Sequence, residues 1–130
     1  MARHWVNVKK RTSGEVLLTG ARWGASFGAR LRGLMFRRGL KAGEALILVE
    51  PREGRAAVSI HMFCVPFAIA AVWLDAAGRV VDKVKALPWR PYYAPRAPAR
   101  YILETAPEFL DKVNLDDELV FEDCLPPAAR

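Results

Sequence analysis

The feature that most constrains this chain is a run of 17 residues, Val58 to Leu74, that is almost wholly apolar yet contains His61 and Pro66. A run of this length lies at the lower limit for a helix that crosses a bilayer, and a proline near its centre removes a helical hydrogen bond. Its many β-branched and aromatic residues are typical of strands instead. We therefore predict two short buried strands joined at a bend, and no membrane span.

Length and composition fit one folded domain, which we place at residues 1–125 with a frayed tail at 126–130. A chain of 130 residues with 52% hydrophobic and 26% charged residues can bury a sizeable core. The first ten residues, MARHWVNVKK, contain no apolar run of signal-peptide length. Cys64 and Cys124 lie far apart and match no metal-binding pattern. We therefore expect a cytoplasmic protein with two free thiols, no cofactor and no metal.

Short strands dominate the hydrophobic pattern. A Thr-Ser-Gly turn between the first two strands predicts a hairpin. One segment changes to a helical period, because Phe27, Leu31 and Leu34 fall on one helical face after a capping Ser26. Pro107 is placed to open a second helix. The expected strands are 4–10, 14–20, 44–50, 56–63, 67–75, 79–87, 101–106 and 117–123, and the expected helices are 26–40 and 107–115. The pattern predicts an α+β fold: a compact, β-rich antiparallel sheet or open barrel with two short helices.

Charge is distributed unevenly along the chain. Residues 1–41 carry +9, residues 42–105 carry +2 and residues 106–130 carry −5, for a net charge of +6. One interpretation is an anionic partner for the basic third, such as nucleic acid or a phosphorylated ligand. The other is that the basic and acidic ends neutralise each other once the chain is folded.

A loop rich in proline follows the strand at 79–87. Its prolines at 88, 91, 95 and 98 favour a stiff, extended path. The same loop holds the one dense aromatic and basic cluster of the sequence, Trp89, Arg90, Tyr92 and Tyr93. Exposed, these side chains would suit stacking with single-stranded nucleic acid or contact with a proline-rich peptide. Alternatively, the rings fold back over the core and anchor the loop.

His61 has four interpretations, one of which is contact with a ligand without chemistry. As a metal ligand it would combine with Met62, Cys64 and optionally Met35, which suit Cu(I), but strand alternation turns His61 away from the two sulfurs of the same strand. As a catalytic group it would need a carboxylate such as Asp75 or Glu104. As a structural group it would be buried and hydrogen-bonded to the backbone.

Several motifs occur in an order that resembles the domain-of-unknown-function family numbered 192. The resemblance runs from about Arg11 to Glu122. Its marks are the helix residues Arg30, Gly33, Leu34 and Met35; the strand start Ile60 and His61; the hairpin residues Leu74, Asp75, Gly78, Val80 and Val81; the loop residues Pro88, Trp89 and Arg90; and the strand residues Leu103 and Glu104.

The resemblance implies a small β-rich α+β domain, found in bacteria and archaea and sometimes behind an export signal, without an established activity. This chain departs from the family's Pro-x-Asp pattern, because Ala70 stands at the acidic position. Any mechanism that requires that carboxylate is therefore in doubt.

Three functional hypotheses stay open. The first is a non-catalytic binding module for an anionic ligand or nucleic acid, with ligand-binding candidates Arg30, His61, Trp89, Arg90 and Tyr92. The second is an enzyme of undetermined class centred on His61, with Arg30 holding an anionic group of the substrate. The third is a structural or protein-interaction domain. We favour the first, in which Arg30, Arg90 and His61 line one concave surface.

Overall fold

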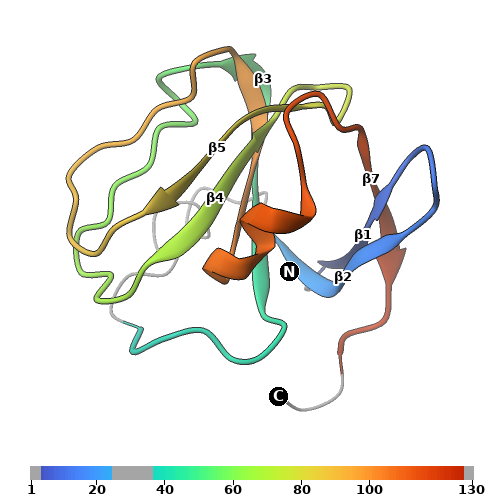
Figure 1. Ribbon diagram of the computed structural model, residues 1–130, viewed down its shortest axis with the longest axis horizontal. Helices are drawn as coiled ribbons and strands as arrows, with labels where there is room; N and C mark the ends of the chain where they lie inside the picture. Colours follow the sequence, from blue (N-terminus) through green and yellow to red (C-terminus); the bar gives the residue numbers. More distant parts are fainter. Residues whose placement is uncertain (1–3, 25–36, 128–130) are drawn as a thin grey trace.

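The computed structural model of this protein describes residues 4–24 and 37–127. Its seven strands form a single sheet that curls around one short 3-10 helix (Figure 1). The strands are β1 (His4–Lys10), β2 (Val16–Gly24), β3 (Ala45–Gly54), β4 (Ile69–Leu74), β5 (Val80–Ala86), β6 (Ala99–Thr105) and β7 (Leu119–Cys124), and the 3-10 helix η1 is Pro107–Lys112.

The sheet is mixed, which corrects the purely antiparallel arrangement expected from the sequence. The strand order is β5-β4-β6-β3-β2-β1-β7. β2 and β3 pair in parallel, with Arg22 opposite Leu46 and Gly24 opposite Leu48. The other pairs are antiparallel. Side chains alternate in the same way in parallel and antiparallel strands, so the hydrophobic pattern could not show that β2 and β3 run parallel.

The two outermost strands meet at one end and partly close the sheet. The amide of Leu119 donates to the carbonyl of Gly78 over 2.9 Å, and the amide of Val80 donates to the carbonyl of Asp117 over 2.9 Å. Arg79 and Glu118 form an antiparallel bridge between them. The result is a curled half-barrel rather than a flat sheet.

Two apolar clusters lie on opposite faces of the sheet. The inner cluster takes residues from all seven strands and from η1, so it fills the inside of the curl. The outer cluster joins β3, β4 and β6 to the segment 58–65, which covers the outer face. Side chains alternate between them: in β4, Val72 belongs to the inner cluster and Trp73 to the outer one.

Most of the expected elements are confirmed. The hairpin of β1 and β2 is present, and the expected strands at 44–50, 67–75, 79–87, 101–106 and 117–123 correspond to β3 to β7. Pro107 opens a helix, although it is a 3-10 helix of six residues. Of the expected helix at 26–40, residues 26–36 lie outside the described residues, and residues 37–40 are not helical. Two short helices are therefore not confirmed.

The strand expected at 56–63 is wrong. This segment contains a turn and a single β-bridge at Ile60, and Cys64 follows it with a φ of 60°. Its apolar residues Val58, Ile60 and Met62 are buried, but against the outer face of the sheet rather than within the hydrogen-bonded ladder. The long apolar run is thus one cover segment followed by one strand. Within residues 4–24 and 37–127, no helix has the length and apolarity that a bilayer crossing needs.

Candidate functional site

Two segments far apart in sequence, 60–63 and 89–93, run side by side over the outer face. Ile60 and Tyr93 exchange backbone hydrogen bonds of 2.8 and 2.9 Å. Further along, the amide of Met62 donates to the carbonyl of Arg90 over 2.7 Å, and the amide of Trp89 donates to the carbonyl of Met62 over 3.0 Å. These bonds fix the proline-rich loop against the segment that carries His61.

In the segment 60–63 buried and exposed side chains alternate, whereas residues 89–92 are all exposed. Ile60 and Met62 are buried in the outer cluster, and Tyr93 packs against it. His61 and Phe63 are exposed, as are Trp89, Arg90 and Tyr92. Trp89 keeps 56% of its surface in solvent, Tyr92 61% and Phe63 48%. We name the exposed group His61, Phe63, Trp89, Arg90 and Tyr92 the aromatic platform. Large apolar rings exposed together in this way mark interaction surfaces.

The backbone at both ends of the platform is in an unusual conformation. Trp89 has a φ of 65° and Cys64 a φ of 60°, and neither is glycine. A left-handed conformation costs such residues about 1–2 kcal/mol. It is held at Trp89 by the hydrogen bond to Met62, and strain of this kind gathers at functional sites.

Three basic residues at and after the end of β1 pair with acidic residues in and before β7. On neighbouring strands Lys9 pairs with Glu122 at 2.5 Å, and His4 pairs with Asp123 at 2.5 Å. Next to these strands, two further pairs join Lys10 to Asp117 and Arg11 to Glu118. The internal-neutralisation interpretation of the charge asymmetry is therefore confirmed for β1.

Arg90 differs from these residues. Its side chain is exposed and forms no ion pair with any residue in the described part of the chain. It stands beside Trp89 in the platform and leaves a positive charge free among the exposed rings.

The expected burial of His61 is wrong, although its expected hydrogen bond to the backbone is present. His61 is exposed, its ring lies 5.3 Å from that of Phe63, and its Nδ1 accepts a 3.2 Å hydrogen bond from the Phe63 amide. Val58, Ile60 and Met62 are buried in the outer cluster, so the residues that alternate with them, His61 and Phe63, face solvent.

The geometry also separates His61 from its expected partners. Met62 is buried while His61 is exposed, and Met35 lies outside the described residues. The Asp75 carboxylate is occupied in its own turn, where it accepts from the amides of Ala77 and Arg79. Among the described residues, no three His, Cys, Asp or Glu side chains are grouped to hold a metal.

Glu104 is the buried carboxyl of the sheet. It sits on β6 between Leu46 of β3 and Ala71 of β4 and is 6% exposed. Burial raises its pKa to about 7. Its side chain has no hydrogen bond or ion pair with the residues that the structure describes. Glu104 is shielded from solvent, whereas His61 is exposed. No hydrogen bond joins Glu104 to His61, so the structure shows no acid–base pair between these two residues.

Of the five sequence-predicted ligand residues, the structure brings four together: His61, Trp89, Arg90 and Tyr92. Arg30 lies outside the described residues, so its place on a shared concave surface with Arg90 and His61 stays a prediction. Phe63 also belongs to the aromatic platform, but it was not among the ligand residues predicted from the sequence. Strand alternation would have indicated it, because Phe63 lies two residues after His61 and so faces the same side.

The fold defines a β-rich domain built on a curled mixed sheet. The chain belongs to domain-of-unknown-function family 192 (DUF192), described as "Uncharacterized ACR", whose model matches residues 8–121. The resemblance seen in the motifs from Arg11 to Glu122 is thereby confirmed.

Relatives and a solved structure agree with this assignment. A UPF0127 protein of Thermococcus sibiricus is 36% identical over 114 residues, which cover 86% of this chain and 72% of that protein. A UPF0127 protein of Thermococcus kodakarensis is 44% identical over 79 residues, 61% of this chain but 48% of that protein. The crystal structure of a Sinorhizobium meliloti protein matches with a TM-score of 0.78 at 19% identity, over 92% of this chain and 94% of that one. At that identity the likeness shows the fold alone.

Proposed function

We propose that this protein is a non-catalytic binding domain whose aromatic platform takes single-stranded nucleic acid. The observation that carries the proposal is the joint exposure of Trp89 and Tyr92 beside Arg90, which has no ion pair among residues 4–24 and 37–127. Bases stack on exposed aromatic rings, each for about 1–3 kcal/mol, while basic side chains follow the phosphates.

The shape of the platform supports single strands over duplex. Its rings project from two hydrogen-bonded segments, so they are presented by rigid backbone rather than by a free loop. Unstacked bases can reach such rings, whereas the bases of a duplex are already stacked on each other. His61 adds a further ring to this surface.

The ion pairs at β1 reduce the electrostatic attraction that its basic residues can contribute to a bound nucleic acid. Since Lys9, Lys10 and Arg11 already have acidic partners, Arg90 is the platform's own phosphate contact. With so few cations the salt dependence of binding should be shallow, and stacking should dominate.

An enzyme centred on His61 is the weaker hypothesis. General acid–base or nucleophilic catalysis requires a partner within hydrogen-bond reach. The hydrogen bond that the structure gives the His61 ring, within the described residues, comes from the amide of Phe63. Binding without chemistry fits this exposed ring better.

The test is fluorescence anisotropy with labelled oligonucleotides, single-stranded and duplex, across a salt series. We expect single strands to bind more tightly than duplex, and Trp89→Ala to weaken binding about tenfold or more through the loss of one stacked base. Arg90→Gln should weaken binding less and flatten the salt dependence.

Two control variants keep the test specific. Leu125→Ala removes an apolar side chain that is 86% exposed but distant in sequence from both platform segments. Arg79→Gln removes an exposed arginine from the β4–β5 turn, where it pairs with Asp75. Both should bind as the parent does. Absence of binding to single strands at low salt, or unchanged binding by Trp89→Ala, would reject the proposal.

A further inference from the structure

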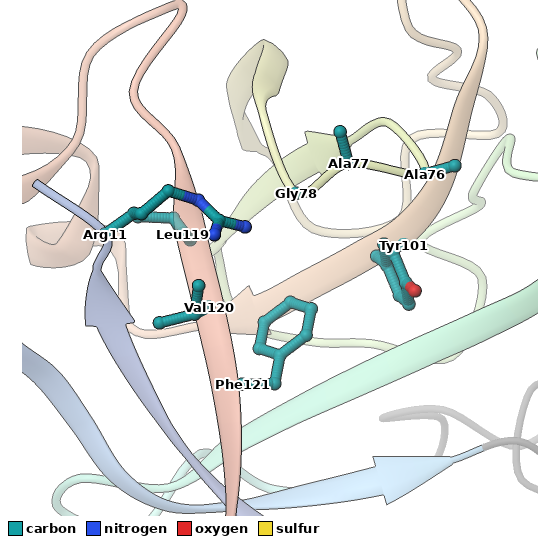
Figure 2. Close-up of a pocket in the computed structure, with 8 residues that line it drawn as sticks. All are labelled: Arg11, Ala76, Ala77, Gly78, Tyr101, Leu119, Val120 and Phe121. Carbon is teal, nitrogen blue, oxygen red and sulfur yellow. The ribbon is translucent and has the colours of Figure 1, made fainter.

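A cavity opens on the other side of the sheet from the aromatic platform. It has a volume of about 200 Å³ and lies where β7 meets the β4–β5 turn (Figure 2). Its walls come from the inner face: Tyr101 of β6 and Phe121 of β7 both pack against the inner cluster, whereas the platform residues neighbour the outer one. The two sites are therefore separate.

The floor of the cavity is aromatic. The rings of Tyr101 and Phe121 meet edge to face with centroids 5.2 Å apart, and Trp23 stands behind both, 5.8 Å from Tyr101 and 5.5 Å from Phe121. Such a ring cluster offers edges and faces to a further planar ring. The opposite wall is the β4–β5 turn, where Gly78 presents backbone rather than a side chain.

A positive charge stands at the rim. Arg11 lines the cavity, and Figure 2 shows its guanidinium extended toward the space between Gly78 and Phe121. Its Nε lies 3.0 Å from a carboxylate oxygen of Glu118, but both side chains are about half exposed. Exposed pairs of this kind are weak, and a guanidinium has four further N–H donors once its Nε is engaged. Arg11 can therefore bind a second carboxylate in a fork-like geometry.

We propose that this cavity binds a small aromatic carboxylate, with its ring on Tyr101 and Phe121 and its carboxylate on Arg11. The volume is sufficient for a single ring, because an enclosed cavity of about 150 Å³ holds benzene and this one, which is open to solvent on one side, is about 200 Å³. Ligand pockets are found in the mouths of barrels and combine apolar walls with few polar groups. Arg100 already covers one side of the Tyr101 ring at 5.2 Å, and a cation at the rim of the remaining aromatic floor selects a ligand that is both planar and anionic.

Benzoate is the probe for the test. Titration into the isotope-labelled protein, followed by amide chemical shifts, measures the affinity and locates the site. We expect shifts centred on Gly78, Leu119 and Phe121. Benzamide, which keeps the ring but lacks the charge, and acetate, which keeps the charge but lacks the ring, should each bind at least about tenfold more weakly, since a charge-assisted bond and a buried ring each contribute at least that factor.

Variants assign the roles. Arg11→Gln should reduce benzoate affinity about tenfold or more and leave benzamide binding nearly unchanged. Phe121→Leu, which keeps an apolar side chain in the inner cluster, should weaken both ligands. Arg79→Gln is the matched control: it removes a neighbouring arginine that does not line the cavity, and it should bind benzoate as the parent does.

Three results would overturn the proposal: no benzoate-dependent shifts at millimolar concentration, shifts centred away from Gly78 and Phe121, or an Arg11→Gln variant that binds benzoate as tightly as the parent. Because the platform lies on the other face, oligonucleotide binding by the same samples stands or falls independently of this result.

Discussion

The amide of Leu119 donates a 2.9 Å hydrogen bond to the carbonyl of Gly78, and this bond joins the two outermost parts of the sheet. The β4–β5 turn therefore lies directly against the start of β7. Gly78 has a φ of +88°, and a Cβ built there would come within 2.3 Å of the Leu119 carbonyl oxygen. Closure of the half-barrel thus depends on a residue without a side chain.

Gly78→Ala should destabilise the protein by about 3 kcal/mol, because it combines a left-handed backbone with a clash against main-chain atoms that cannot rotate away. The measurement is urea unfolding followed by tryptophan fluorescence. Gly14→Ala is the matched control: its φ is +74°, but its Cβ would meet no atom within 4 Å. That variant should lose only about 1 kcal/mol. Equal losses in both variants would contradict the close approach at Leu119.

The buried Glu104 should make stability depend on pH. Burial raises its pKa from 4.5 to about 7, so between these values the folded carboxyl holds a proton that the unfolded chain has released. Its contribution to stability is therefore intact below about pH 4.5, falls as the pH rises toward 7, and is constant above that. The total loss is about 3 kcal/mol.

Glu104→Gln isolates this effect, since glutamine keeps the size of the side chain and does not ionise. The variant should match the parent near pH 4 and exceed it in free energy of unfolding by about 3 kcal/mol above pH 7. Glu15→Gln, an exposed position in the β1–β2 turn, should show no such divergence. A constant difference across the pH range would exclude a raised pKa at Glu104.

Trp73 fastens the cover segment to the sheet. Its Nε1 donates a 2.8 Å hydrogen bond to the buried carbonyl of Val58. Trp73→Phe leaves that carbonyl without its partner and leaves unfilled volume, which should cost about 2–4 kcal/mol. Chemical denaturation measures this loss, and Trp89→Phe, at an exposed position, should change stability by less than about 0.5 kcal/mol. Similar losses for the two substitutions would show that the Val58 bond contributes nothing.

Local pattern predicted the strands well where alternation and turn chemistry agree. The hairpin of β1 and β2 followed from alternation and a turn that contains glycine, and β4 followed from its β-branched and aromatic content before a second glycine turn. The parallel pairing of β2 with β3 did not, because strand direction depends on how the chain crosses between strands and not on residue type. The segment around His61 failed for a related reason: apolar side chains that cover a sheet resemble those within one.

The sequence predicted which residues form the candidate site, but it predicted less well which of their side chains are exposed to solvent. Trp89, Arg90 and Tyr92 were identified by composition, but whether the rings face solvent depends on hydrogen bonds to Met62 and Ile60, about thirty residues earlier. Tyr93 does fold back, and its hydroxyl accepts from the amide of Leu87 over 2.9 Å. In this loop Tyr93 therefore anchors against the core, while Trp89 and Tyr92 are exposed.

The pairing of β1 with β7 also sets an order for biosynthesis. His4 and Asp123 are neighbours in the sheet but 119 residues apart in the chain. Until β7 has emerged from the ribosome, the edge of β1 presents unpaired N–H and C=O groups, which are prone to pair with other chains. Lys9 on that edge carries the kind of charge that discourages such pairing. The lysine that pairs with Glu122 in the folded protein would therefore also disfavour pairing of the bare β1 edge with other chains.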